Sequence, residues 1–141
     1  MQDLTLEAAV EMVAAAKRRA EKIGVPQNIA VVDAGGNLKA FVRMDGAWLG
    51  SIDLAIRKAR TSRLFDKETG EIGKMSKPGG PLYQIEVSNG GLITFPGGIP
   101  IFNEDSEVIG AIGVSGGTVK EDYDVASEGV KAIKHAIRRA A

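Results

Sequence analysis

The chain has 141 residues, of which 18 are Lys or Arg and 18 are Asp or Glu, so its formal net charge is zero. This length suits one domain, which we expect over 1–141, and a chain of this size can bury about two-thirds of its unfolded surface. Balanced charge gives no long-range attraction to nucleic acid or an anionic membrane. The chain has no cysteine, which excludes disulfides, thiolate metal sites and cysteine nucleophiles.

The first predicted element is an amphipathic helix over 5–23, with Thr5 as its N-cap and Gly24 at its C-terminal end. No apolar run approaches the roughly 18–20 residues of a membrane helix. The N-terminal segment also lacks the basic start and small-residue cleavage site of a signal peptide. We therefore expect a cytoplasmic protein.

Two short apolar runs, 28–33 and 38–44, flank a Gly-Gly turn and predict a β-hairpin. A second helix is predicted over 51–64, with Ser51 as its cap. Residues 65–80 are polar and rich in Gly, Lys and Glu, which indicates a surface excursion with about one helical turn. Residues 82–87 fit either a strand or a short helix.

Three more strands are predicted, at 91–95, 98–103 and 107–115, the last two joined as a hairpin. The final strand is apolar on both faces, which favours a central position covered on both sides. Thr118 and Glu121 have the spacing of a capping box at the start of a last helix. The expected buried stripe of that helix consists of Tyr123, Ala126, Val130, Ile133 and Ile137.

This order of elements predicts an α+β fold with about five mainly antiparallel strands packed with helices. Gly110 and Gly113 lie inside a predicted strand, where glycine indicates close packing or the approach of a ligand, and packing is the commoner case. The Pro96-Gly97-Gly98 segment fits a simple turn and a pocket-lining loop equally well. No phosphate-loop or dinucleotide motif accompanies these glycines, so we reject a nucleotide cradle.

Several single residues are candidates for chemistry. Arg43, Lys58 and Thr61 could converge on an acidic ligand, since Arg and Lys pair well with carboxylates. Lys58 and Asp45 are weak candidates for acid–base catalysis, and no metal site is predicted. Trp48 fits packing, a pocket mouth or an oligomer contact.

Three further residues have side chains that can take part in binding or proton transfer. Tyr83 and Tyr123 could serve as phenolic ligands or proton donors, although core packing with a bonded hydroxyl is the commoner role for each. His135 is the single histidine, and helical geometry predicts that it is exposed. One exposed histidine cannot build a histidine metal site.

Three segments resemble the GlcG/HbpS family, also called DUF336 or the haem-degrading domain, which includes the C-terminal domain of PduO-type proteins. They are VVDAGGNLKAFVRMDGAW, SIDLAIRKARTS and FPGGIPIFNEDSEVIGAIGVSGGTVKEDYDVA, and the resemblance covers 4–139. It implies a profilin-like fold, homo-oligomers and, in some members, the binding or degradation of haem. The positions that match the family and are implied to line a pocket are Lys58, Thr61, Gly97, Gly98, Pro100, Ser115 and Gly116.

Some members of that family bind haem iron through a histidine of the N-terminal helix. The predicted N-terminal helix of this chain contains no histidine, so an axial ligand here would be Thr, Tyr, Lys or Met, or else the iron would be five-coordinate or bound to water.

The favoured hypothesis is an accessory protein that binds a small ligand, either haem, a related tetrapyrrole or a smaller acidic metabolite, in a glycine-lined pocket. One alternative is a metal-independent enzyme that acts on a small carboxylate-bearing metabolite. Another is a non-catalytic oligomeric assembly partner. In each case we expect a homo-oligomer that binds neither nucleic acid nor membrane. The predicted ligand-binding residues are Arg43, Lys58, Thr61, Pro96, Gly97, Gly98, Pro100, Ser115 and Gly116.

Overall fold

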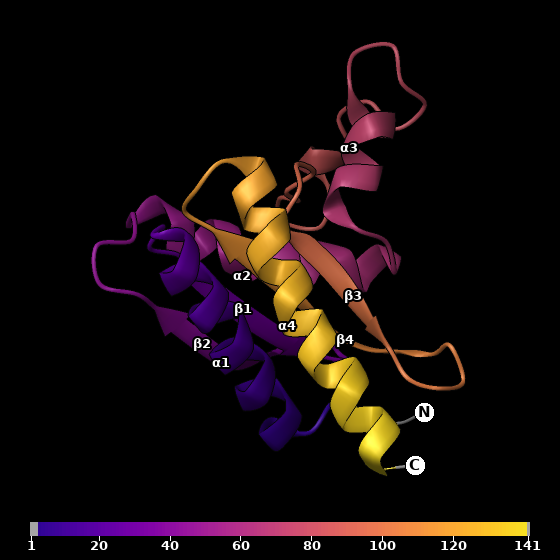
Figure 1. Ribbon diagram of the computed structural model, residues 1–141. Helices are drawn as coiled ribbons and strands as arrows, with labels where there is room; N and C mark the ends of the chain where they lie inside the picture. The colour runs from indigo at the N-terminus through magenta and orange to yellow at the C-terminus, as the bar shows by residue number, and fades with distance from the viewer. Residues whose placement is uncertain (1–2, 141) are drawn as a thin grey trace.

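The computed structural model describes residues 3–140, with side chains described over 3–133 (Figure 1). The elements in chain order are α1 (Leu6–Ile23), β1 (Asn28–Asp33), β2 (Leu38–Arg43), α2 (Gly50–Phe65), α3 (Thr69–Ser76), a 3-10 turn (Ile85–Val87), β3 (Gly98–Phe102), β4 (Val108–Ser115) and α4 (Val119–Ala140). Within this described part, no helix combines the length and the apolar character needed to cross a membrane.

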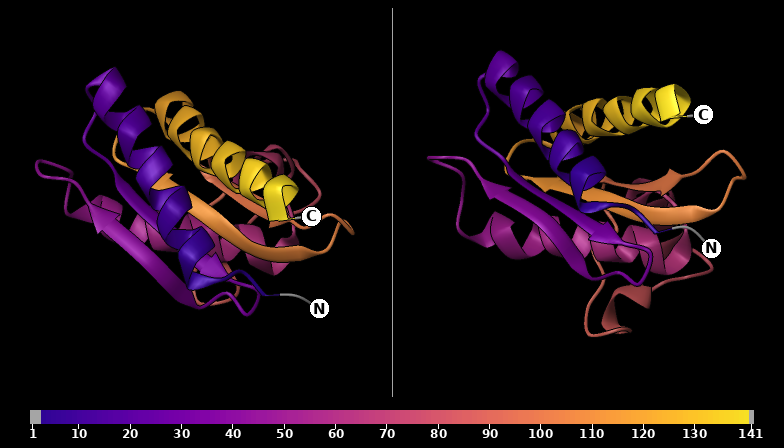
Figure 2. Two further views of the ribbon diagram at one scale, coloured as in Figure 1. Left: turned by 60° about the horizontal axis from the view of Figure 1, so that its bottom comes forward. Right: turned by 90° about the horizontal axis from the view of Figure 1, so that it is seen from below.

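The four strands form one antiparallel sheet in the order β2-β1-β4-β3. Helices α1 and α4 lie side by side on one face of the sheet, and α2 covers the other (Figure 2). The predicted α+β class and the antiparallel sheet are therefore confirmed. The sheet has four strands rather than about five, because the amides of the segment 91–95 bond elsewhere. The Leu92 N–H donates to the Glu86 carbonyl, and the Ile93 N–H donates to Thr61 Oγ1 at 3.2 Å.

Strand β4 is central and all eight of its residues are buried, as predicted. Alternate side chains of β1 and β4 enter two different cores. Ile29, Ile112 and Val114 pack under α1 and α4 in the larger core. The opposite face carries small residues, such as Ala30 and Ala111, which pack against the alanines of α2. The small residues allow α2 to lie close to the sheet.

Gly113 shows how close that approach is. A Cβ added at Gly113 would collide with the Ala55 carbonyl oxygen and the Ala59 backbone of α2. The space at this glycine is thus filled by the helix and leaves no room for a ligand. The packing interpretation of the strand glycines is therefore confirmed at this position.

The helix ends follow local sequence signals closely. The Thr5 side chain accepts a hydrogen bond from Ala8 N, and Gly24 ends α1 in the left-handed conformation. The capping box is formed, since Glu121 N donates to Thr118 Oγ1 at 3.1 Å and Thr118 N donates to Glu121 Oε1 at 2.9 Å. The prediction for Ser51 was wrong: α2 begins one residue earlier, and Ser51 is buried inside its first turn.

The excursion after α2 is more ordered than its composition indicates. Residues Thr69–Ser76 form a helix of eight residues, longer than the predicted single turn. The segment 82–87, which the sequence leaves open, contains the 3-10 turn Ile85–Val87 and no strand. Thr69, Ile72 and Ser76 bury one face of α3, which anchors it to the rest of the domain.

Strand β3 is an edge strand whose outer side has few free donors. Val114 N donates to the Gly97 carbonyl at 3.0 Å, so in the alternating antiparallel ladder Gly98 and Pro100 turn their backbone away from β4. Gly98 N already donates to Thr69 Oγ1 at 2.9 Å, and Pro100 has no N–H. This edge is therefore poorly suited to the addition of another strand.

Candidate functional site

Lys58 lies in the centre of the domain and is fully buried. Its ammonium donates to the Val114 carbonyl at 2.8 Å and to Asp122 Oδ2 at 2.9 Å. The Phe95 ring covers it, with 4.9 Å between Nζ and the ring centroid, which is a cation–π contact. The lysine thus joins α2, β4 and α4, and its polar partners are all protein groups.

Burial dominates the electrostatics of this pair. Desolvation lowers the pKa of Lys58, although the neighbouring Asp122 carboxylate acts to raise it. Desolvation raises the pKa of Asp122 against the opposing effects of Lys58 and of the hydrogen bond from Gly117 N. For both groups, the free-energy cost of removing the charge from water is larger than the stabilisation by the oppositely charged partner. This balance is common for buried ion pairs.

The loop before β3 lies directly on this lysine. A Cβ added at Gly97 would stand 2.7 Å from Lys58 Nζ and 2.6 Å from the Val114 oxygen. Gly97 also has a φ of 132°, which favours glycine. Gly98 approaches the Lys58 carbonyl oxygen in the same way, at 2.5 Å from its added Cβ. These glycines accommodate the lysine and the backbone of α2.

The structure brings many of the predicted ligand-binding residues into one buried region. Thr61 and Ser115 are buried there with Lys58, and Thr61 accepts a hydrogen bond from Ile93 N. Pro96 and Gly116 are half-buried, and only Pro96 and Pro100 reach the grooves described below. The residues concerned are Lys58, Thr61, Pro96, Gly97, Gly98, Pro100, Ser115 and Gly116.

Arg43 and Asp45 lie apart from this region. Arg43 ends β2 at the far edge of the sheet and is exposed, and Asp45 is exposed in the loop that follows. Two strand spacings, about 10 Å, separate β2 from β4, where the Lys58 ammonium binds. The expected convergence of Arg43 on Lys58 and Thr61 is therefore not seen.

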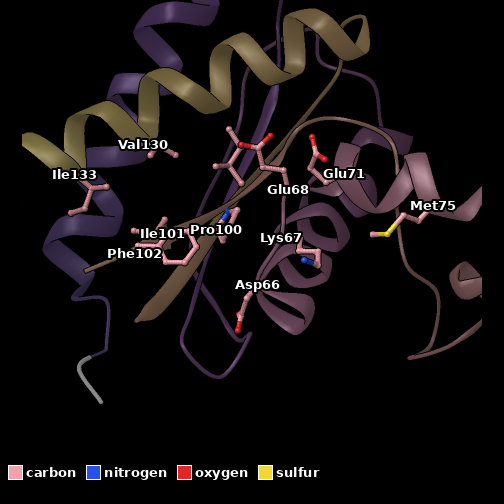
Figure 3. Close-up of a pocket in the computed structure, with 11 residues that line it drawn as sticks. Asp66, Lys67, Glu68, Glu71, Met75, Pro100, Ile101, Phe102, Val130 and Ile133 are labelled. Atoms are coloured by element: carbon pink, nitrogen blue, oxygen red, sulfur yellow. The ribbon is translucent and has the colours of Figure 1, made fainter. Parts of the chain in front are cut away.

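Two grooves open beside α3 and the segment that leads into it. The first, which we call the strand groove, has a volume of about 660 Å³. Figure 3 shows apolar side chains of β3 and α4 facing charged side chains of the segment between α2 and α3. It is lined by Asp66, Lys67, Glu68, Glu71, Met75, Ile99, Pro100, Ile101, Phe102, Val130 and Ile133.

The second, which we call the tyrosine groove, has a volume of about 440 Å³. Both volumes fall within the range of small-molecule sites, about 300–1,000 Å³. The two grooves share Glu68 and Glu71, so they are neighbours. The tyrosine groove is lined by Glu68, Gly70, Glu71, Lys74, Pro96, Val119, Lys120 and Tyr123.

Tyr123 contributes the one phenol of the two groove linings. It is 40% exposed, so its place in the predicted buried stripe of the last helix was wrong. Its hydroxyl donates to Glu68 Oε2 at 3.4 Å, a long and therefore weak hydrogen bond. Lys74 pairs with Glu71 at 3.1 Å on the surface, while Lys120 has no ion-pair partner among the described residues. The groove therefore offers two lysines, two glutamates, a phenol and apolar contacts from Pro96 and Val119 together.

No sequence pattern indicates this groove as a whole, because its lining comes from three separate segments, 68–74, 96 and 119–123. Tyr123 is a candidate phenolic ligand from its residue type, whereas no motif marks Glu68, Lys74 or Lys120. Within the described part of the chain, no group of three or more His, Cys, Asp or Glu residues could hold a metal ion. The His135 side chain lies outside that part.

Comparison with known proteins places this chain in a family. Residues 4–131 match the family described as "Haem degrading protein HbpS-like", and the chain belongs to this HbpS-like family. It is also 41% identical, over 120 residues and 84% of each chain, to a Citrobacter freundii protein named "Uncharacterized 15.0 kDa protein in dhaT-dhaS intergenic region". The resemblance found in the sequence is thereby confirmed.

Solved structures give the same assignment. The Klebsiella pneumoniae protein ORFY, of the DUF336 family, superposes with a TM-score of 0.92 at 38% identity, covering 95% of this chain and 92% of that one. A structure described as a PduOC:Heme complex superposes with a TM-score of 0.88 at 33% identity, covering 93% of this chain and 95% of that one.

Proposed function

We propose that this protein is an accessory protein that binds haem or a related tetrapyrrole, and that the tyrosine groove is the site. The observation that carries the proposal is the composition of this groove, which joins two lysines and a phenol to apolar contacts from Pro96 and Val119. Membership of the HbpS-like family and the likeness to the haem complex support the same ligand class.

The residues of the groove fit the three chemical parts of haem. Pro96 and Val119 are apolar and would contact the macrocycle. Lys74 and Lys120 would pair with the two propionates, because carboxylate–ammonium hydrogen bonds are among the stronger ones. The ion pair of Lys74 with Glu71 is solvent-exposed, so exchanging it for a propionate costs only about 0–1 kcal/mol. When bound, the haem iron would supply ligand binding or redox chemistry.

Titration with hemin tests this proposal. We expect the Soret band to change saturably at a fixed ratio of hemin to subunit. Protoporphyrin IX, which has no iron, should bind the same groove through its ring and carboxylates. Lys120→Ala should weaken the binding of both, roughly tenfold for the loss of one charge-assisted hydrogen bond.

Lys17→Ala is the control, because Lys17 is also an exposed helix lysine but lies on α1 and lines neither groove. It should bind both tetrapyrroles like the unmodified protein. Featureless, non-saturating binding of both compounds would refute the proposed function. Equal losses in the Lys17 and Lys120 variants would show that the lysines act only through overall charge.

A metal-independent enzyme remains the second candidate, supported by one observation. The pKa of Lys58 is lowered by burial, as acid–base catalysis by a lysine requires. Phe95 and Gly97 close this lysine off, so a substrate would reach it only after the loop before β3 moves. Iron-free turnover of a carboxylic acid would support this candidate if it is retained in Lys17→Ala and abolished in Lys58→Met under conditions where circular dichroism shows that the Lys58 variant is folded.

A further inference from the structure

The supply of iron ligands in this chain is small. It has no cysteine, and α1 contains no histidine. The side chains of the tyrosine groove that carry a donor atom are two lysines, two glutamates and Tyr123. A lysine ammonium is a hydrogen-bond donor with no lone pair to offer a metal, so the two lysines are poor iron ligands. Tyrosine, in contrast, is an established oxygen ligand of haem iron in proteins.

Tyr123 is held in a position from which it can be released. Its hydroxyl has one partner, Glu68, at 3.4 Å, and Glu68 belongs to the segment that leads into α3 rather than to α4. A neutral hydrogen-bond partner would only orient the phenol, whereas a carboxylate can also accept its proton. Coordination requires this, because the phenol O–H bond must break as the oxygen lone pair forms the bond to iron.

The charge that results is offset by the ferric iron itself, because Fe³⁺ bound to a porphyrin dianion keeps one net positive charge. Lys120 lies three residues before Tyr123 on α4 and lines the same groove, so it stays available to pair with a propionate.

We infer that Tyr123 is the protein ligand of ferric haem in this chain, with Glu68 accepting the phenol proton. This inference rests on the proposed function, because it assumes that the tyrosine groove holds the tetrapyrrole.

The test compares Tyr123→Phe with the unmodified protein. Phenylalanine keeps the ring and removes the oxygen, so the shape of the groove is retained. The unmodified protein with hemin should show a phenolate-to-iron charge-transfer band and phenolate modes in its resonance Raman spectrum. The variant should lose both signals and bind hemin at least about tenfold more weakly, while its affinity for protoporphyrin IX stays within about twofold.

Tyr83→Phe is the matched control, because Tyr83 is also exposed but lines neither groove. It should keep the spectrum and the affinity of the unmodified protein. If Tyr123→Phe leaves the hemin spectrum unchanged, the inference is wrong while the proposed function stands. If the variant weakens hemin and protoporphyrin IX equally, Tyr123 only packs on the ring, and the inference is again wrong. If the unmodified protein binds neither compound saturably, the proposed function itself fails.

Discussion

Replacing Lys58 by methionine should destabilise the protein strongly, because it leaves the Asp122 carboxylate buried without its cation. Asp122 is 2% exposed and keeps the hydrogen bond from Gly117 N and the influence of the Gln27 side chain, neither of which supplies a positive charge. Removing one partner of a buried pair costs about 3–5 kcal/mol, a large part of the roughly 5–15 kcal/mol that stabilises a domain. At about 4 °C per kcal/mol, the midpoint of thermal unfolding should fall by about 12–20 °C.

The pH dependence gives this prediction a second, signed test. In Lys58→Met, the main influences that lower the pKa of Asp122 are gone, so its pKa stays above 3.8. A carboxyl group whose pKa is raised in the folded state stabilises the fold most at pH values below its unfolded-state pKa of 3.8. This stabilisation is lost as the pH rises through the raised pKa of the folded state. The loss of unfolding free energy caused by Lys58→Met should therefore become smaller as the pH is lowered toward 3.8.

Asp122→Asn should respond in the opposite direction. It leaves the Lys58 ammonium unpaired, with a pKa below 10.5. Because the unfolded chain then binds more protons than the folded one, stability rises with pH between the lowered value and 10.5. The loss of unfolding free energy caused by Asp122→Asn should therefore become smaller at alkaline pH. The double variant removes both charges and should recover about 1–3 kcal/mol relative to the sum of the single changes.

Urea unfolding followed by circular dichroism, at several pH values, measures all three variants. A loss below about 1 kcal/mol at neutral pH would be typical of a surface ion pair and would refute the burial argument. Deficits that do not vary with pH in either single variant would refute the assignment of the shifts to desolvation.

Three further predictions address packing, acid stability and assembly. Gly113→Ala should cost at least about 1–3 kcal/mol in a urea titration, because its Cβ would collide with Ala55, whereas Gly50→Ala, in open space, should cost nothing measurable. The pKa of Asp3 is lowered chiefly by the hydrogen bond from Ala34 N, so the stability it gives is present above 3.8 and is lost as pH falls through the lowered value. Asp3→Asn should accordingly be less stable at neutral pH and equal at strongly acid pH, and an unchanged difference would contradict this. Trp48 is 69% exposed, and we expect it to contact a second subunit, so Trp48→Ala should lower the sedimentation coefficient while the circular dichroism spectrum is unchanged.

The features that the sequence predicted well are local ones. The hairpin of β1 and β2 depends on two neighbouring apolar runs and the Gly-Gly turn between them. The capping box depends on two residues three apart, Thr118 and Glu121. In both cases the interacting groups are close in sequence, so the pattern contains nearly all the information that decides the structure.

The features that it missed depend on distant partners. The segment 91–95 has the composition of a strand. However, the amide of Ile93 donates a hydrogen bond to Thr61, which lies 32 residues earlier in the sequence. Helical spacing put Tyr123 on the buried stripe, yet periodicity cannot show where the element that covers a helix ends. The partner of Lys58 is 64 residues away, and no motif connects it to Asp122.

The strand order has a consequence for how the chain reaches its folded state. On one edge, β1 pairs with β2, which follows it directly in the sequence. On its other edge, β1 pairs with β4, which begins only at Val108. A growing or truncated chain that ends before Val108 therefore presents the unpaired edge of β1, whose residues are nearly all buried in the folded domain, and such edges recruit strands from other chains. We expect such N-terminal fragments to aggregate. Once β4 has been synthesised, it can pair with β1 and remove the exposed edge that drives this aggregation.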